Sequence, residues 1–371
     1  MSPGILLTLA ALMVMMSTGA SSGVDIKRYR DIRLVGRVMY DGTAYQGWQS
    51  QGDDHASSKR RTTIQDKLNS VLRRRFNMEK IHVTGSSRTD AGVHARGQAF
   101  HFDLPRSLCG PNTASPEDLK RLTGTSTPQH GGLDLEFLEY SLNRMLPADI
   151  KMYNVSYAPL VMPRRQSNGD LVYEVLTPAH KNWVERDDEG TIRSDFHAIA
   201  SAKGKLYRYR FCTNKFVDPT RCRYTSHFYL PLDMDVFRQA LSLFEGRYDF
   251  AAFANQVPRS TIAFEGQDMT FNTVKTVHKI SLEEEEERGY YSINFELESA
   301  LYKMVRNIVG TCKMAAEGGG GNARVKVDVP YIEQLLQQQG DQASRLTRAD
   351  NLALSAPAEG LTLERVHFDS Y

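Results

Sequence analysis

Residues 85–97 read Gly-Ser-Ser-Arg-Thr-Asp-Ala-Gly-Val-His-Ala-Arg-Gly, and a strand pattern follows them directly. Phe100, Phe102 and Leu104 alternate there with other residues, which is the period of a half-buried β-strand. An apolar segment also precedes the stretch, so we expect a loop that joins two strands at a sheet edge. Its glycines allow the backbone to approach a ligand closely. The stretch therefore predicts a ligand-binding loop on a β-sheet.

Asp90 is the single carboxylate of this loop, and its neighbours Arg88, His94 and Arg96 are positive or titratable. An opposite charge nearby keeps a carboxylate ionised. An ionised, partly desolvated aspartate can serve as a nucleophile. The alternative is that Asp90 caps a turn and pairs with Arg88 for stability, and spacing alone favours this alternative.

Further strands and helices alternate unevenly along both halves of the chain. Leu34–Tyr40 has the strand period, and Thr62 or Thr63 can begin a helix. In the second half, Tyr207–Phe211 alternates aromatic and basic residues, and Asp233 can cap the next helix. We also expect a strand near Ile81 and Val83, a helix at Leu135–Met145, a strand at Lys151–Ala158, antiparallel strands at Val274–Leu282 and Tyr291–Leu297, and helices at Leu301–Glu317 and Tyr331–Gln339. This order predicts an α+β fold with antiparallel or mixed sheets.

Two polar stretches interrupt this order. Ser107–Gly132 is rich in Ser, Thr, Gly and Pro, and we expect a surface insertion with a short helix at Pro116–Leu122. Met162–Ser194 is polar and irregular, and the domain boundary is expected in it. The run Glu283–Glu287 is predicted to be a solvated hairpin tip, because like charges without fixed turn residues make a poor metal cage. We expect a leader at 1–30, an N-terminal domain at 31–160, a polar insertion at 161–194 and a C-terminal domain at 195–371.

The composition is that of a folded protein. Of the 371 residues, 41% are apolar and 24% are charged, which supports a globular core in two or three domains. Lys and Arg number 46 and Asp and Glu 44, so the formal charge is +2. This balance excludes a polycationic arm or an acidic chain, but not a nucleic-acid partner. The four cysteines stand outside any Cys/His cluster, so we expect neither a disulfide framework nor a metal site.

The N-terminal segment contains an uncharged apolar run, Ile5–Met16, with small residues after it. This run is shorter than the roughly 20 residues that cross a bilayer. It resembles the apolar region of a signal peptide, although no Lys or Arg precedes it. A removable targeting segment and a disordered leader or misassigned start are the two interpretations. We expect no stable membrane association of the mature chain.

Seven motifs resemble, in the same order, those of the TruA-type tRNA pseudouridine synthases. One motif is Arg-Thr-Asp-Ala-Gly-Val-His at Arg88–His94, which resembles the signature of that family. The others are Tyr40–Gln51, Thr63–Leu68, Leu142–Ile150, Phe196–Ala198 with Tyr207–Tyr209, Met304–Gly310 and Glu359–Leu361. Together they extend from about Val38 to Phe368, so the resemblance covers almost the whole chain after the leader.

This resemblance implies a fold and a reaction. The fold is two tandem α/β domains, each around a mainly antiparallel sheet, with the active site in a central cleft. The enzymes are isomerases that need no cofactor: they break the C1′–N1 bond of a uridine in tRNA, turn the uracil and rejoin it through C5. Flipping the base makes these atoms accessible. The implied partner is tRNA, and members of the family work as homodimers.

The resemblance also implies three catalytic residues. Asp90 matches the essential nucleophile, which attacks either the base or the sugar carbon. Tyr207 matches a tyrosine that stacks on the base and is a candidate for removing the C5 proton, and Arg306 matches the arginine that pairs with the aspartate. Taken alone, Tyr207 shares a strand face with Tyr209 and Phe211, as a core aromatic would. Arg306 lies at the rim of its helix's apolar face, where a solvated arginine would fit equally well.

Five further residues are predicted to bind substrate. Arg88 matches the arginine that takes the place of the flipped nucleotide, and Thr89 and His94 belong to the same signature. Tyr45 and Trp48 are candidates for stacking on RNA bases. Without the family resemblance, both aromatic residues would be interpreted as ordinary half-buried side chains.

The sequence departs from the family pattern at three places. Ile199 stands where an arginine usually follows the motif Phe196–Ala198, which puts tRNA affinity or site choice in doubt. Ser87 replaces the glycine usually found before Arg-Thr-Asp, and Leu301–Lys303 replaces a more aromatic segment that contains histidine. The three catalytic positions are unaffected, so we expect activity.

We therefore predict an enzyme that converts uridines 38 to 40 of the tRNA anticodon stem-loop to pseudouridine, because Arg88–His94 is closest to the bacterial form of the signature. The alternatives are a non-catalytic RNA-binding or chaperone protein on the same scaffold, against which Asp90 argues, and a synthase acting on other RNA sites. A glycosidase would normally need two carboxylates. A bacterial-like sequence with an apolar leader predicts a plastid or mitochondrial location, with the cytoplasm or nucleus as the alternative.

Overall fold

The computed structural model describes eleven segments of the chain: residues 31–50, 62–105, 133–158, 161–165, 171–175, 196–256, 262–264, 267–269, 272–318, 326–337 and 346–368. The leader at 1–30, the expected helix at Pro116–Leu122 and most of the insertion at 161–194 lie outside them. Two predictions about the chain's organisation, the targeting segment and the structure of the first insertion, therefore stay predictions.

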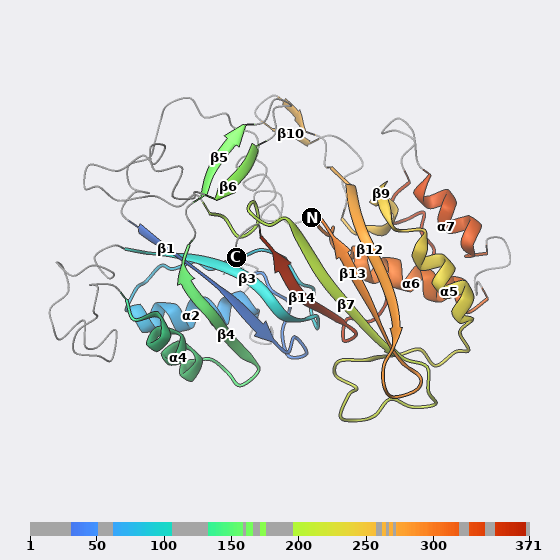
Figure 1. Ribbon diagram of the computed structural model, residues 1–371, viewed down its shortest axis with the longest axis horizontal. Helices are drawn as coiled ribbons and strands as arrows, with labels where there is room; N and C mark the ends of the chain where they lie inside the picture. Colours follow the sequence, from blue (N-terminus) through green and yellow to red (C-terminus); the bar gives the residue numbers. More distant parts are fainter. Residues whose placement is uncertain are drawn as a thin grey trace.

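A single large sheet runs through the molecule, in the order β4-β1-β3-β14-β7-β13-β12-β9 (Figure 1). Two short strands pair beside this path, β2 with β3 and β8 with β7. The strands are β1 Asp31–Tyr40, β2 Thr84–Gly85, β3 His94–Pro105, β4 Ile150–Tyr157, β7 Gly204–Cys212, β8 Ser226–His227, β9 Gly246–Asp249, β12 Val274–Glu284, β13 Tyr290–Leu297 and β14 Leu361–His367. Most neighbours are antiparallel, which confirms the predicted α+β class.

The last strand, β14, joins the two halves of this sheet. It pairs in parallel with β3 through Thr362 and Leu363, and antiparallel with β7 from Leu361 to His367. The halves were expected to have separate sheets on either side of a cleft. In the structure their sheets are continuous, because the C-terminal strand returns to the middle of the molecule between them (Figure 1).

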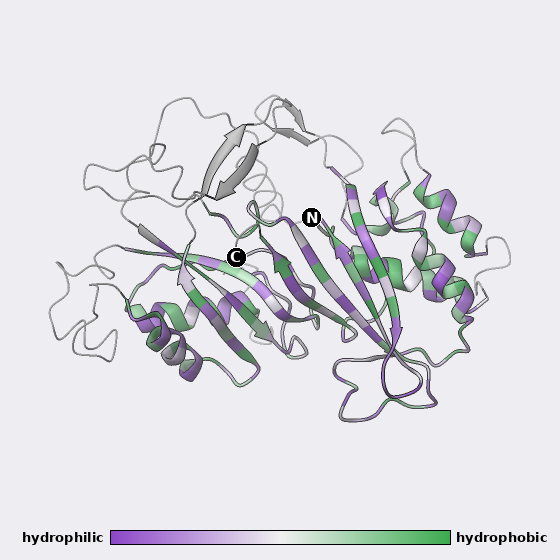
Figure 2. Cartoon of the chain, viewed as in Figure 1, coloured by the Kyte–Doolittle hydropathy of each residue, from purple (hydrophilic) through white to green (hydrophobic). Residues whose placement is uncertain are grey.

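The described helices lie on one face of the sheet (Figure 1). They are α2 Ile64–Phe76, α4 Leu135–Met145, α5 Met234–Ser242, α6 Met304–Ala316 and α7 Val329–Leu336, with the short 3-10 helix η4 Ala251–Phe253. Their buried side chains join those of the strands in one hydrophobic core that extends through both halves. Hydrophobic and hydrophilic residues alternate along β7 and β13, so the opposite face of the sheet is polar (Figure 2).

Local sequence signals explain where the helices begin. Thr63 caps α2, and its side chain and that of Asp66 bond reciprocally to the backbone of the first turn, which is a capping box. Asp233 caps α5 by accepting from the backbone of Asp235 and Val236. The predicted helix at Leu135–Met145 has the same limits in the structure. These predictions are confirmed.

Two predictions about polar segments were incomplete or wrong. Part of the stretch expected to be irregular forms a hairpin of β5 Val161–Arg165 and β6 Leu171–Val175; a second small hairpin joins β10 Ile262–Phe264 and β11 Gln267–Met269. The run of glutamates ends β12 and continues into the tip before β13; as predicted it is largely exposed, and only Glu285 is partly buried, but the prediction missed its basic partners.

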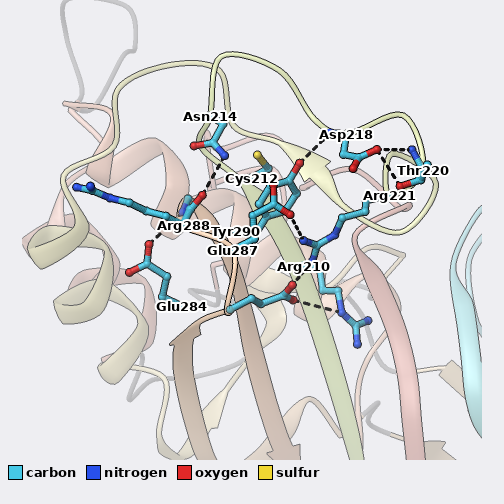
Figure 3. Close-up of polar contacts among 12 residues, drawn as sticks. Arg210, Cys212, Asn214, Asp218, Thr220, Arg221, Glu284, Glu287, Arg288 and Tyr290 are labelled. Carbon is cyan, nitrogen blue, oxygen red and sulfur yellow. Dashed lines mark hydrogen bonds and ion pairs between the residues drawn. The ribbon is translucent and has the colours of Figure 1, made fainter.

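Arg221 from the segment after β7 neutralises part of this acidic tip (Figure 3). Its guanidinium bonds to Glu285, and its Nη1 lies 3.0 Å from Oε2 of Glu287. It also lies over the ring of Tyr290, 4.0 Å from the centroid. Arg210 approaches Glu285 from β7 at 3.6 Å. The partners come from a distant part of the chain, which is why the sequence pattern did not indicate them.

Candidate active site

The side chains of Asp90 and Arg306 form an ion pair between the two halves of the molecule. Nη1 of Arg306 lies 2.7 Å from Oδ2 of Asp90. Only 12% of the arginine side chain and 10% of the aspartate side chain are exposed. Two opposite charges that are this close and this poorly solvated attract each other, and removing one would leave the other buried without its partner. The carboxylate that the sequence singled out is therefore paired, but with Arg306 and not with Arg88.

The loop after β2 presents Asp90 because a second backbone segment supports it. The amide of Val93 donates to the carbonyl of Asp90 at 3.1 Å, which closes a turn, and Gly92 takes a φ of +79° there. The amide of Trp48 donates to the carbonyl of Thr89 at 3.1 Å. Gly47, with a φ of +88°, passes so close that a β-carbon would lie 2.4 Å from that same carbonyl oxygen. Only glycine fits this approach.

Helix α6 and the segment before β14 orient Arg306. Its Nε donates to the carbonyl of Ala356 at 2.8 Å, and the amide of Ala356 donates back to the carbonyl of Arg306 at 2.9 Å. One turn later, Gly310 lies against the backbone of Leu354, where a β-carbon would be 1.9 Å from the carbonyl oxygen. The guanidinium is thus held on one side by backbone and on the other by Asp90.

Tyr207 stands beside this pair on the central strand β7, between Phe295 of β13 and Leu363 of β14. It is almost fully buried, and its hydroxyl lies 2.8 Å from Oγ of Ser87. Burial raises the pKa of Tyr207 to about 12, and the negative charge of Asp90 adds to the effect. The side chain is therefore a neutral phenol at physiological pH. The structure brings together all three predicted catalytic residues.

Two of the predicted substrate-binding residues directly precede Asp90 in the chain and differ in their surroundings. Arg88 is exposed, and within the described segments its side chain makes neither a hydrogen bond nor an ion pair. Thr89 is buried, and its Oγ1 lies 2.8 Å from the hydroxyl of Tyr40. Arg88 is thus free to meet a ligand, whereas Thr89 anchors the loop.

His94 faces the other side of the sheet. It pairs with Thr362, which pairs in turn with Arg208, whereas Tyr207 is one register position further along the same ladder. Side chains at adjacent positions of a ladder point to opposite faces. The Nδ1 of His94 accepts from the amide of Gly42 at 3.1 Å, and burial lowers its pKa. The structure therefore does not place His94 with the predicted catalytic side chains.

A pocket of about 510 Å³ opens beside His94 on this polar face. Its lining includes His94, Arg96, Arg210 and Tyr224, but not Asp90. The pocket and the ion pair are therefore separate features of the described part of the structure.

Tyr45 and Trp48 lie in the hydrophobic core, 5% and 2% exposed. The hydroxyl of Tyr45 donates to Oδ1 of Asp149 at 2.8 Å. The indole of Trp48 covers Gly85, where a β-carbon would be 2.3 Å from the ring. This burial favours the alternative of ordinary core aromatics for both residues. They support the segment that holds Asp90.

Comparison with known proteins identifies the family. A tRNA pseudouridine synthase family model matches residues 37–135 and 240–369, more than half of the chain. The chain belongs to the tRNA pseudouridine synthase family. It is 32% identical over 333 residues to tRNA pseudouridine synthase A 1 of Protochlamydia amoebophila, covering 90% of this chain and 95% of that protein. It is 28% identical to tRNA pseudouridine synthase A 1 of Desulfotalea psychrophila, and this match covers 91% of this chain and 100% of that protein.

Membership in the tRNA pseudouridine synthase family makes the protein an isomerase and confirms the predicted family, fold class and enzyme type. The relative from Leuconostoc mesenteroides, tRNA pseudouridine synthase A, is 27% identical over 334 residues and is covered to 97% of its length. The matches extend over about nine-tenths of the chain. They therefore include the segments that carry Asp90, Tyr207 and Arg306.

Four residues near the site had no predicted role. Tyr302, before α6, is 43% exposed, and burial together with the charge of Asp90 raises its pKa. Ser87, Gln98 and Lys205 form a buried polar group under the loop. Ser87 and the segment Leu301–Lys303, which contains Tyr302, carried a signal as departures from the family pattern. The other contacts depend on which strands are neighbours, and the sequence pattern does not show this.

Neither a metal cluster nor a membrane crossing is found in the described segments. They contain no group of three or more His, Cys, Asp or Glu side chains placed to hold a metal ion. Of the helices in those same segments, none has the length and apolar character that a bilayer crossing needs. Both findings concern the described residues alone.

Proposed function

We propose that this tRNA pseudouridine synthase family protein acts on uridines 38 to 40 of the tRNA anticodon stem-loop, with Asp90 as the nucleophile. The observation that carries the proposal is the ion pair between Asp90 and Arg306, with the phenol of Tyr207 beside it. An arginine that donates to the carboxylate fixes its orientation, which a nucleophile needs.

The geometry supports a distinct task for each side chain. The carboxylate of Asp90 would form a covalent bond to the uridine, at the base or at the sugar carbon, as C1′–N1 breaks, and this bond would break again when C5 is joined to C1′. Tyr207 would pack against the base and is the candidate for removing the C5 proton after the uracil has rejoined the sugar, for which its phenol must first give up its own proton. The exposed guanidinium of Arg88, which makes no ion pair with the residues that the structure describes, would fill the space that the flipped nucleotide leaves in the RNA, and would contact its phosphates.

Site choice is tested by mapping pseudouridine on unmodified tRNA transcripts after incubation with the protein. A transcript with uridines at 38 to 40 is compared with a matched transcript that carries cytidines there. Product confined to those three positions is expected. Pseudouridine at other positions of both transcripts would contradict the proposed site while leaving the activity in place.

We also propose that the protein works as a homodimer and is located in an organelle, either a plastid or a mitochondrion. The first proposal rests on the family and is tested by the mass of the protein in solution, for which a monomer at working concentration is the contradicting result. The second rests on the apolar run Ile5–Met16. Fusing residues 1–40 to a fluorescent reporter tests it, and a diffuse cytosolic signal would contradict it.

A further inference from the structure

Ser87 connects the loop of Asp90 to the strand that carries Tyr207. Its Oγ lies 2.8 Å from the hydroxyl of Tyr207 and 3.4 Å from Nζ of Lys205. Lys205 and Tyr207 are two residues apart on β7, so both side chains leave the same face of the strand. All three side chains are buried. The hydroxyl of Ser87 is thus enclosed between an ammonium group and a phenol.

The position of this hydroxyl is fixed by the backbone of the loop. The amide of Ser87 donates to Oε1 of Gln98 at 3.1 Å, and Nε2 of Gln98 donates back to the carbonyl of Ser87 at 2.5 Å. Nζ of Lys205 donates to the carbonyl of Ser86 at 3.1 Å. These contacts use only main-chain atoms of the loop, so they persist when the side chain of Ser87 is removed.

The phenol of Tyr207 depends on Ser87 for its orientation. Among the residues that the structure describes, Ser87 provides the one hydrogen bond to that hydroxyl. A buried hydroxyl without a hydrogen-bond partner costs the full desolvation penalty of that group. The bond to Ser87 therefore strongly favours the one position of the Tyr207 ring that allows it. Burial lowers the pKa of Lys205 to about 8, so it remains an ammonium group at neutral pH and donates to its neighbours.

We infer that Ser87 is a positioning residue of this enzyme: its hydroxyl holds the phenolic oxygen of Tyr207 in place beside Asp90. The family motif usually has glycine at this position, which offers no hydroxyl, so the contact is a property of this chain. The inference rests on the proposed function of Asp90 and Tyr207. Losing the contact would disturb the reacting geometry and leave tRNA binding unchanged, because Ser87 is covered by its neighbours.

The test is the rate of pseudouridine formation by four variants. Ser87→Ala and Ser87→Gly remove the hydroxyl, and Ser87→Thr keeps it. Ser86→Ala is a matched control, because Oγ of Ser86 is buried in the same loop without a hydrogen-bond partner within the described segments. We expect Ser87→Ala and Ser87→Gly to lower kcat about tenfold with KM for tRNA within about twofold, while Ser86→Ala and Ser87→Thr stay close to wild type.

The outcomes separate the inference from the proposed function. Product from wild type, with kcat of both Ser87→Ala and Ser87→Gly equal to that of Ser86→Ala, would overturn the role of Ser87 alone. A change in KM without a change in kcat would also overturn it. No product from wild type would contradict the proposed function and the inference that rests on it. Ser87→Gly is the second variant because glycine is the residue of the family motif.

Discussion

Arg306 and Asp90 are 216 positions apart in the chain, and their side chains meet at 2.7 Å. The contact is possible because β14 returns between β3 and β7 and joins both halves into one sheet. Asp90 follows a strand of the first half, and Arg306 lies on a helix of the second. The ion pair therefore depends on the relative position of the two halves, and it also belongs to the candidate active site.

Replacing Arg306 tests the electrostatic part of this account. Arg306→Ala leaves a poorly solvated carboxylate without its partner, so we expect a loss of about 3 kcal/mol in the free energy of unfolding and at least a hundredfold lower kcat. Adding Asp90→Asn should recover stability but not activity, because the buried charge is then gone. Denaturant unfolding and the rate of product formation measure the two effects. Equal stability of Arg306→Ala and wild type would contradict the pair's importance.

Gly47 is predicted to be essential for the loop that carries Asp90. In Gly47→Ala, a methyl group would lie 2.4 Å from the carbonyl oxygen of Thr89, in a left-handed conformation with a φ of +88°. Gly318→Ala is the matched control, because its φ is +87° and nothing lies within 4 Å of the new methyl group. We expect about 1 kcal/mol of destabilisation in the control and clearly more in Gly47→Ala, with loss of activity. Equal effects would show that the close approach is unimportant.

Arg88 is predicted to act on substrate alone. Because its side chain is exposed and unpaired in the described part of the structure, Arg88→Ala should change the free energy of unfolding by less than about 0.5 kcal/mol. We expect kcat/KM for tRNA to fall about tenfold or more. Arg238→Ala, another exposed arginine on α5, controls for the loss of one positive charge. A similar fall in kcat/KM for both variants would indicate a general charge effect.

Stability should fall in acid because of His101. Burial lowers the pKa of His101 to about 2, and the positive charge of Arg33 adds to this shift. The Nδ1 atom of the neutral ring accepts a hydrogen bond from the amide of Ala198 at 3.1 Å. Between the unfolded pKa of about 6.5 and the folded value, the unfolded chain binds more protons, so stability decreases as pH falls through this window. At pH 4.5 the loss amounts to about 3 kcal/mol.

His101→Asn keeps an acceptor for Ala198 and removes the titrating group. Its unfolding free energy should therefore depend less on pH between 6.5 and 4.5 than that of wild type, as measured by urea unfolding at several pH values. Parallel curves for the two proteins would contradict the linkage to His101.

Much of the fold was predictable because its signals are local. The caps at Thr63 and Asp233 and the alternation of β7 and β13 depend on residues close together in the chain, and the structure has these elements near the expected limits. The continuity of the sheet was not predictable. The continuity depends on which strands pair with β14, and the residue pattern of β14 does not indicate those strands.

The candidate site shows the same division. The motif around Asp90 led to the ion pair with Arg306. The side of the sheet to which His94 turns depends on its register with Thr362, and the burial of Trp48 depends on its contact with Gly85. The partner of the acidic tip, Arg221, is also distant in sequence. Motifs therefore indicated the residues of the candidate site, and long-range packing decided where several of their side chains lie.

The most direct test of the account compares wild type, Asp90→Ala and Asp90→Asn on unmodified tRNA, with pseudouridine mapped and quantified after a long incubation. Both variants remove the carboxylate, and the Asn side chain in Asp90→Asn has nearly the same shape as the Asp side chain that it replaces. The account predicts pseudouridine from wild type and none above background from either variant, although both still bind tRNA. Product from Asp90→Ala equal to that of wild type would contradict the role of Asp90, and with it the central claim.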